Sequence, residues 1–222
     1  TDCGFAIGPS RANPLTGQLY DADIGFSEAI TRFFRQEIVE QINPVSWEEE
    51  PVRPFLAPWS SNPMRYYCDV GTGAIREAQF GLDLLVARGM DPAGPDGDKF
   101  VQEFLREIAA HEVGHTLGLR HNFRASTIHT LEQAQNPAVT GSQGLTGSVM
   151  DYIPTNLAAR GAKQGEYHQS TLGPYDYWAI EYAYKPIDAP APDAEVPELQ
   201  KIAARASASR TPEYRTVNLR PS

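Results

Sequence analysis

The residues best suited to chemistry lie in one eleven-residue run, His111 to His121, which reads H-E-V-G-H-T-L-G-L-R-H. His111 and His115 are four residues apart, so on an α-helix both imidazoles lie on one face and can reach the same ion. Gly118 can end that helix with a left-handed turn, which would bring His121 back as a third ligand. Three neutral nitrogens and one open coordination position are typical of a catalytic zinc site, whereas structural zinc sites are closed.

Glu112 directly follows the first of these histidines and can reach a water molecule bound to the ion, so we expect it to act as the general base. An H-E-x-x-H pattern alone can also arise by chance on a helix surface. The extended pattern adds Gly118 and His121 at set spacing, and three of the five histidines of the chain fall inside it. The sequence therefore predicts one catalytic Zn²⁺ ion, bound by His111, His115 and His121.

A second candidate segment, Ser148–Tyr152, reads S-V-M-D-Y and follows the histidine run after a stretch rich in Gly, Ser, Thr and Asn. The composition of that stretch predicts a connection without helix or strand. Taken alone, Met150 would be an ordinary core methionine. Tyr152 taken alone would be a buried tyrosine with a satisfied hydroxyl group.

Four stretches of the chain together resemble known proteases. They read G-P-S-R-A-N-P-L-T-G-Q-L-Y-D-A-D-I, H-E-V-G-H-T-L-G-L-R-H-N-F-R-A-S, L-T-G-S-V-M-D-Y and G-P-Y-D-Y-W-A-I-E-Y-A-Y-K-P. A histidine run of this form with a later methionine turn is the metzincin signature. More closely, the stretches resemble a family of large bacterial zinc-dependent metalloproteases whose catalytic unit was labelled a domain of unknown function. The resemblance covers most of residues 4–186.

The resemblance implies roles for residues outside the histidine run. Met150 would lie on a tight turn beneath the metal as an apolar floor. Tyr152 would bind the metal or stabilise the oxyanion, as in the astacin-like and serralysin-like branches. An extended peptide would add to an edge strand, and residues after Tyr152 would wall the pocket for the side chain that follows the cut. The substrate-binding residues implied in this way are Phe5, Ala6, Ile7, Ile153, Pro154 and Thr155.

The resemblance also implies an α+β fold of the metzincin type. This fold has a twisted mixed sheet with one antiparallel edge strand, an active-site helix beneath it, and a C-terminal lobe after the third zinc histidine. Gly4–Pro9 would be the edge strand and Asp21–Phe26 the next strand inward. Metzincins usually have further strands and a helix before the edge strand. Either these N-terminal elements are missing from this chain and lie upstream in a longer protein, or the mapping is wrong.

Local patterns predict the individual elements. Apolar periodicity, caps and turn residues predict strands at 4–8, 18–26 and 65–70, a turn at 13–17, an irregular segment at 43–63, and helices at 28–42, 72–88, 99–117, 173–182 and 198–208. Four prolines between 185 and 197 indicate a linker. We therefore expect a catalytic domain at 1–186, as part of a longer protein, followed by a Pro/Ala-rich linker and C-terminal extension at 187–222.

Composition narrows the class of partner. The chain has 222 residues and a net charge of −9, which argues against a nucleic-acid or anionic-membrane surface. No apolar run is long enough to span a bilayer.

The remaining candidate residues have ordinary interpretations. Cys3 and Cys68 form a disulfide if the protein is exported, or remain buried thiols. The loop Asp91–Asp98 is acidic but lacks EF-hand spacing, so a solvated loop is favoured over a calcium site. His129 and His168 are isolated in polar stretches, and we expect surface roles for them.

These observations favour a zinc-dependent metalloendopeptidase that acts on a peptide or protein substrate. The resemblance places such an enzyme in an extracellular or periplasmic location. Two alternatives remain: a zinc hydrolase of non-protein amides such as those of peptidoglycan, and an inactive binding module that retains its metal. An intact Glu112 argues against the inactive module, because loss of the base is the simplest route to inactivity.

Overall fold

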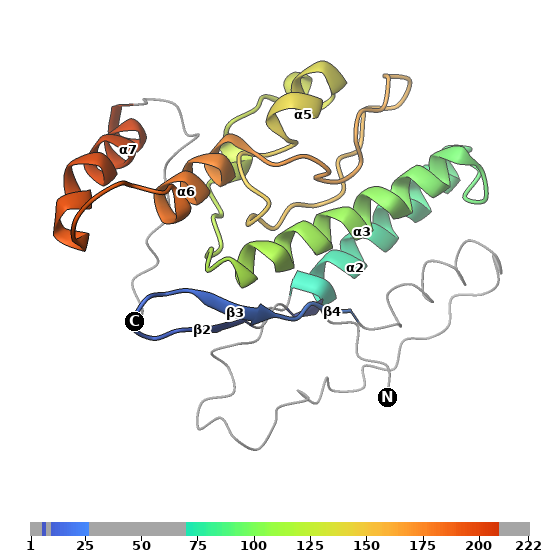
Figure 1. The fold of residues 1–222 in the computed structure, drawn as a ribbon. Coiled ribbons are helices and arrows are strands. Elements are labelled where there is room, and N and C mark those ends of the chain that lie inside the picture. Colours follow the sequence, from blue (N-terminus) through green and yellow to red (C-terminus); the bar gives the residue numbers. More distant parts are fainter. Residues whose placement is uncertain (1–5, 8–9, 27–69, 209–222) are drawn as a thin grey trace, which may run out of the picture.

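The computed structural model describes residues 6–7, 10–26 and 70–208 (Figure 1). In this part of the chain the fold is α+β and mostly helical, with four short strands. Several sequence predictions lie outside the described residues. They are the helix at 28–42, the irregular segment at 43–63, most of the strand at 65–70, Phe5, Cys3 and Cys68.

The four strands form two antiparallel pairs. The strands are β1 (Ala6–Ile7), β2 (Ser10–Ala12), β3 (Leu19–Ala22) and β4 (Gly25–Phe26). β1 pairs with β4 and β2 pairs with β3. The predicted strand at 18–26 is therefore divided in two, because its halves have different partners, and β2 was not predicted. The turn at 13–17 is confirmed, with Gly17 at a φ of 73°.

The pairing of β1 with β4 agrees with the expectation that residues before Phe26 neighbour the edge strand. A larger twisted sheet is not among the described residues and stays a prediction. Below the helices in Figure 1, the strand pairs form a narrow ribbon, and β1 contacts the second long helix.

Two long helices lie side by side above this ribbon (Figure 1). They are α2 (Val70–Ala87) and α3 (Pro95–Thr116). The predictions at 72–88 and 99–117 are confirmed to within a few residues. Gly89, at a φ of 98°, follows the end of α2 as expected.

The start of α3 corrects the predicted loop at 91–98. Pro95 occupies the first turn, a position where its missing N–H costs nothing. Asp96 and Asp98 lie in the same turn, where the positive end of the helix dipole favours negative charge. The side chain of Asp91 accepts a hydrogen bond from the backbone N–H of Ala93, at 3.0 Å. These acids therefore have local structural roles at the start of α3.

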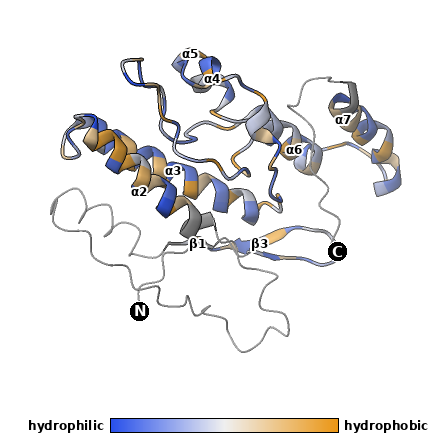
Figure 2. Ribbon diagram, turned by 180° about the vertical axis from the view of Figure 1, so that it is seen from behind, coloured by the Kyte–Doolittle hydropathy of each residue, from blue (hydrophilic) through white to orange (hydrophobic). Residues whose placement is uncertain are grey.

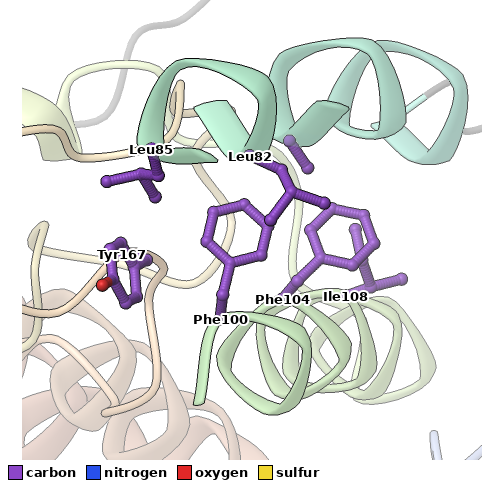
Figure 3. Close-up of a cluster of buried hydrophobic side chains, with 7 residues drawn as sticks. Leu82, Leu85, Phe100, Phe104, Ile108 and Tyr167 are labelled. Carbon is purple, nitrogen blue, oxygen red and sulfur yellow. The ribbon is translucent and has the colours of Figure 1, made fainter. Parts of the chain in front are cut away.

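The core lies between α2 and α3. Figure 3 shows Phe100, Phe104 and Ile108 of α3 directed towards Leu82 and Leu85 of α2, and all five are buried. Figure 2 shows hydrophobic residues interleaved with hydrophilic ones along both helices, as expected of helices with one buried side. The apolar stripe on α3 continues to His111, so packing of this core sets the direction in which the first histidine points.

The chain after the third histidine contains several further helical elements, and its description as a separate C-terminal lobe stays a prediction. Its helical elements are η2 (Ala125–Thr127), α4 (Leu131–Ala134), α5 (Pro137–Gln143), α6 (Pro174–Tyr184), η3 (Pro192–Glu195) and α7 (Val196–Ala208). The prediction that residues 122–147 are a connection without elements is wrong. Short helices form there because Thr130 and Asn136 cap the N-termini of α4 and α5.

α6 and α7 agree with the helices predicted at 173–182 and 198–208. α7 packs on α6, where the indole Nε1 of Trp178 donates to the carbonyl of Ile202 at 2.9 Å and Ile202 itself is buried. The predicted linker contains the η3 turn. The division into domains at residue 186 stays a prediction. Among the described helices, none is long and apolar enough to cross a membrane.

Candidate metal centre

The end of α3 shapes the site. Gly118 has a φ of 83°, as the sequence predicts. Its N–H donates to the carbonyl of His115 at 2.9 Å, and the N–H of Leu119 donates to the carbonyl of Gly114 at 2.9 Å. This pair of bonds is the Schellman motif, which closes a helix and reverses the chain. The reversal returns the backbone towards α3 and brings His121 beside the two helical histidines.

The three imidazoles of the run converge. One nitrogen from each of His111, His115 and His121 lies within 4.8 Å of the others, and this is the one such group of three or more potential ligands among the described residues. The Nε2 atoms of His115 and His121 are 3.1 Å apart. A tetrahedral zinc ion with Zn–N bonds of about 2.0–2.1 Å holds two ligand nitrogens about 3.3 Å apart. The observed separation is close to that value.

The outer nitrogens of the two helical histidines are fixed by backbone carbonyls. His111 Nδ1 donates to the carbonyl of Val149 at 2.8 Å, and His115 Nδ1 donates to the carbonyl of Leu119 at 3.1 Å. Because a carbonyl only accepts, each neutral ring carries its proton on Nδ1 and presents a lone pair at Nε2. This is the tautomer and support that a zinc-binding histidine requires. The donor set therefore fits one zinc ion.

The electrostatics of the site also suit a cation. Burial, reinforced by the neighbouring His115, lowers the pKa of His111 to about 3. Burial likewise lowers the pKa of His115. Both effects keep the imidazoles neutral, which leaves their lone pairs available to a metal.

Glu112 lies on α3 with its side chain fully buried. Within the part of the chain that the structure describes, neither of its carboxylate oxygens has a hydrogen-bond partner. Burial raises the pKa of Glu112 to about 7. A group with a pKa near neutrality can take up and release a proton at physiological pH, which is the property that a general base needs.

Met150 lies on a turn and is fully buried, and its place beneath the metal stays a prediction. Its sulfur packs against Gly114, where an added Cβ would meet the Sδ atom at 2.2 Å. The N–H of the buried Asn122 donates to the carbonyl of Met150 at 2.9 Å and joins this turn to the histidine run. Gly114 and Asn122 were not identified from the sequence. For Gly114 a signal was available, because a glycine inside a helix costs about 1 kcal/mol relative to alanine and so indicates a close contact.

Tyr152 stands at the edge of the cluster. Its hydroxyl oxygen lies 2.9 Å from His121 Nε2, and the two rings have centroids 4.6 Å apart. Phe123, which is 40% exposed, packs with its ring 5.2 Å from that of Tyr152 and 5.4 Å from that of His121. Phe123 was not identified from the sequence, because the pattern gives an aromatic residue after the third histidine no special role.

A family model described as Met-zincin matches residues 94–220, which is more than half of the chain. The chain belongs to the Met-zincin family. The matched segment contains all three histidines together with Glu112, Met150 and Tyr152. Membership implies zinc-metallopeptidase-like chemistry. Searches of curated proteins and of solved structures gave no significant match.

The substrate-binding residues predicted for the Met-zincin site occupy varied places. Ala6 and Ile7 form β1, which contacts α3. Ile153 is half-buried and Pro154 is exposed. Thr155 is turned to α2: its hydroxyl donates to the carbonyl of Glu77 at 3.2 Å, and its side chain fills the space beside a glycine of that helix. These contacts of the Thr155 side chain are with α2, and its role in substrate binding stays a prediction.

The remaining histidines lie apart from the Met-zincin cluster. The expected surface role of His168 is wrong, because this residue is only 2% exposed. Its Nδ1 lies 2.9 Å from a carboxylate oxygen of Glu107, and its ring packs edge-on against Phe100 and Phe104. His129 is partly buried and donates to the carbonyl of Gly144 at 3.0 Å. Neither belongs to the group of three potential metal ligands found among the described residues.

Proposed function

We propose that this Met-zincin chain is the catalytic part of a zinc-dependent metalloendopeptidase. His111, His115 and His121 would hold the ion, with Glu112 as general base. The observation that carries the proposal is the set of three converging imidazoles, two of them fixed by carbonyls, next to a buried carboxylate.

When bound, zinc supplies a Lewis acid that polarises the scissile carbonyl and lowers the pKa of an attacking water. Glu112 accepts the proton of that water and later passes it to the leaving amine. The lack of a hydrogen-bond partner for its carboxylate among the described residues leaves both oxygens available for this transfer.

Tyr152 would donate a hydrogen bond to the oxyanion that develops on the carbonyl oxygen. Its hydroxyl is within hydrogen-bond distance of His121 Nε2, so it lies beside the nitrogens that would face the ion. Met150 would support the site from below, as its packing on α3 indicates.

The substrate would be an extended peptide that adds to the edge strand through Phe5, Ala6 and Ile7. The contact between β1 and α3 supports this placement, because it puts the strand beside the helix that carries the histidines. Ile153 and Pro154 would line the pocket for the side chain after the cut, with Thr155 behind them. We further propose an extracellular or periplasmic location, and a catalytic domain at 1–186.

A hydrolysis assay tests this function. Purified protein is incubated with casein and with quenched fluorescent peptides, with and without a chelator, beside Glu112→Ala and His115→Ala variants. We expect one zinc per chain and hydrolysis that the chelator abolishes. Glu112→Ala should keep zinc and lose turnover by several orders of magnitude, because it removes the base without removing a ligand. His115→Ala should lose zinc.

Other outcomes identify the alternatives. Zinc binding without hydrolysis of any amide would indicate a binding module. Cleavage of peptidoglycan amides without cleavage of peptides would indicate the second hydrolase class. Wild-type hydrolysis by Glu112→Ala would exclude Glu112 as the base.

A further inference from the structure

We propose that Asp176 is a positioning residue for the metal centre, acting on His111 through the backbone of Val149. The inference rests on the proposed function, because it assumes that His111 binds the ion. Asp176 lies in the first turn of α6 and is only 2% exposed.

The first step is the contact between Asp176 and the turn that carries Met150. One carboxylate oxygen of Asp176 accepts from the Ser148 hydroxyl at 2.6 Å. The other accepts from the N–H of Val149 at 3.0 Å. Ser148 Oγ in turn accepts from the N–H of Met150 at 3.0 Å. The carboxylate therefore fixes three consecutive residues of this turn.

The second step leads to the metal. The backbone of Val149 makes two hydrogen bonds. Its N–H donates to Asp176, and its carbonyl accepts from His111 Nδ1 at 2.8 Å. A fixed carbonyl fixes the ring plane and tautomer of the histidine that donates to it. Asp176 thus reaches His111 through a single residue.

The third step is the rigidity of the support. The same Asp176 oxygen accepts from the N–H of Gly173 at 2.8 Å, and the N–H of Tyr175 donates to the carbonyl of Gly147 at 2.9 Å. A Cβ on Gly173 would meet the carbonyl oxygen of Gly147 at 2.1 Å, so the two backbones are in direct contact. The backbone at the start of α6 therefore packs directly against the backbone that leads into the Met150 turn. This contact limits how far Asp176 can shift.

Zinc affinity distinguishes a positioning role of Asp176 from a role in overall protein stability alone. Removal of a group that supports a metal ligand typically costs 10- to 100-fold in affinity. Loss of a buried carboxylate elsewhere lowers stability but leaves the ligands oriented. Glu103 of α3 offers a matched control: it is also buried, and it accepts from the backbone N–H groups of Tyr167 and His168, at 2.6 and 3.4 Å.

The experiment compares zinc dissociation constants of the wild type, Asp176→Ala and Glu103→Ala by competition with a chromophoric chelator. Circular dichroism and thermal unfolding of each metal-free protein report the fold. We expect both variants to unfold at lower temperature. Zinc affinity should fall about 10- to 100-fold in Asp176→Ala and stay within about twofold of wild type in Glu103→Ala.

An Asp176→Ala protein that folds and binds zinc as the wild type does would overturn the inference, as would an equal loss of affinity in the control. If Asp176→Ala does not fold, Asp176→Glu decides by the same criterion, since it keeps the acceptor but displaces it by one methylene group. A wild type that binds no zinc would instead overturn the proposed function, so the two failures are distinguishable.

Discussion

At the scale of single residues, the proposed catalytic role of Tyr152 rests on its hydroxyl, which is 2.9 Å from His121 Nε2. We expect Tyr152→Phe to lower kcat about 10- to 1000-fold with little change in KM, the pattern of an interaction made mainly in the transition state. Steady-state kinetics on a quenched peptide, with zinc content measured in parallel, checks this. Unchanged kcat at full zinc occupancy would make Tyr152 a structural residue.

The site could be located from the sequence to the extent that its residues are close along the chain. His111, Glu112, His115 and His121 were identified because helix geometry and one glycine turn relate them within eleven residues. His168 was misassigned, because its partner Glu107 lies 61 residues away along the chain and local composition carries no sign of that contact. Asp176 was not identified for the same reason, because its partners Ser148 and Val149 lie 28 and 27 residues away along the chain.

At the scale of elements, the contact between α3 and the methionine turn depends on Gly114. Alanine there would favour the helix by roughly 1 kcal/mol, yet its Cβ would meet Met150 Sδ at 2.2 Å. Overpacking costs about 1–3 kcal/mol, so we expect Gly114→Ala to lower the free energy of unfolding and to weaken zinc binding. Chemical denaturation and a zinc titration measure the two effects.

Gly141 of α5 provides the control for this prediction, because nothing lies within 4 Å of a Cβ added there. Gly141→Ala should leave zinc binding unchanged and stability unchanged or slightly higher. Equal stability of the two alanine variants would show that the contact with Met150 is not tight.

The predictability of the elements follows their length. α2 and α3 were predicted to within a few residues because a sustained apolar stripe defines each of them. α4 and α5 have 4 and 7 residues, and capping side chains rather than periodicity define them. The division of the strand at 18–26 depends on which partner each half meets, and that information is tertiary.

At the scale of the whole molecule, the packing of α7 on α6 tests the proposed domain boundary. A chain that ends at residue 186 would lose the bond from Trp178 to Ile202 and the ion pairs between Glu181 and Arg205 and between Lys185 and Glu198. We expect the free energy of unfolding to fall by about 1–3 kcal/mol, because apolar surface that α7 covers becomes exposed. Zinc content should be retained, because α7 contributes no residue to the metal cluster.

Thermal unfolding and elemental analysis of the shortened protein check this prediction. Loss of zinc from a protein that remains folded would place residues 187–222 inside the catalytic unit and move the boundary.

The order of the supports along the chain has a consequence for protein synthesis. The histidine run ends at His121, but the groups that support it come later in the chain. Val149 accepts from His111, Asp176 accepts from Val149, and the Tyr184 hydroxyl donates to the carbonyl of Leu117 at 2.8 Å. A nascent chain that has emerged only as far as Gly173 carries every proposed ligand without the carboxylate that fixes the methionine turn. Synthesis therefore produces the proposed ligands before the residues that support them, so the metal centre can be fully organised only after most of the described chain has been made.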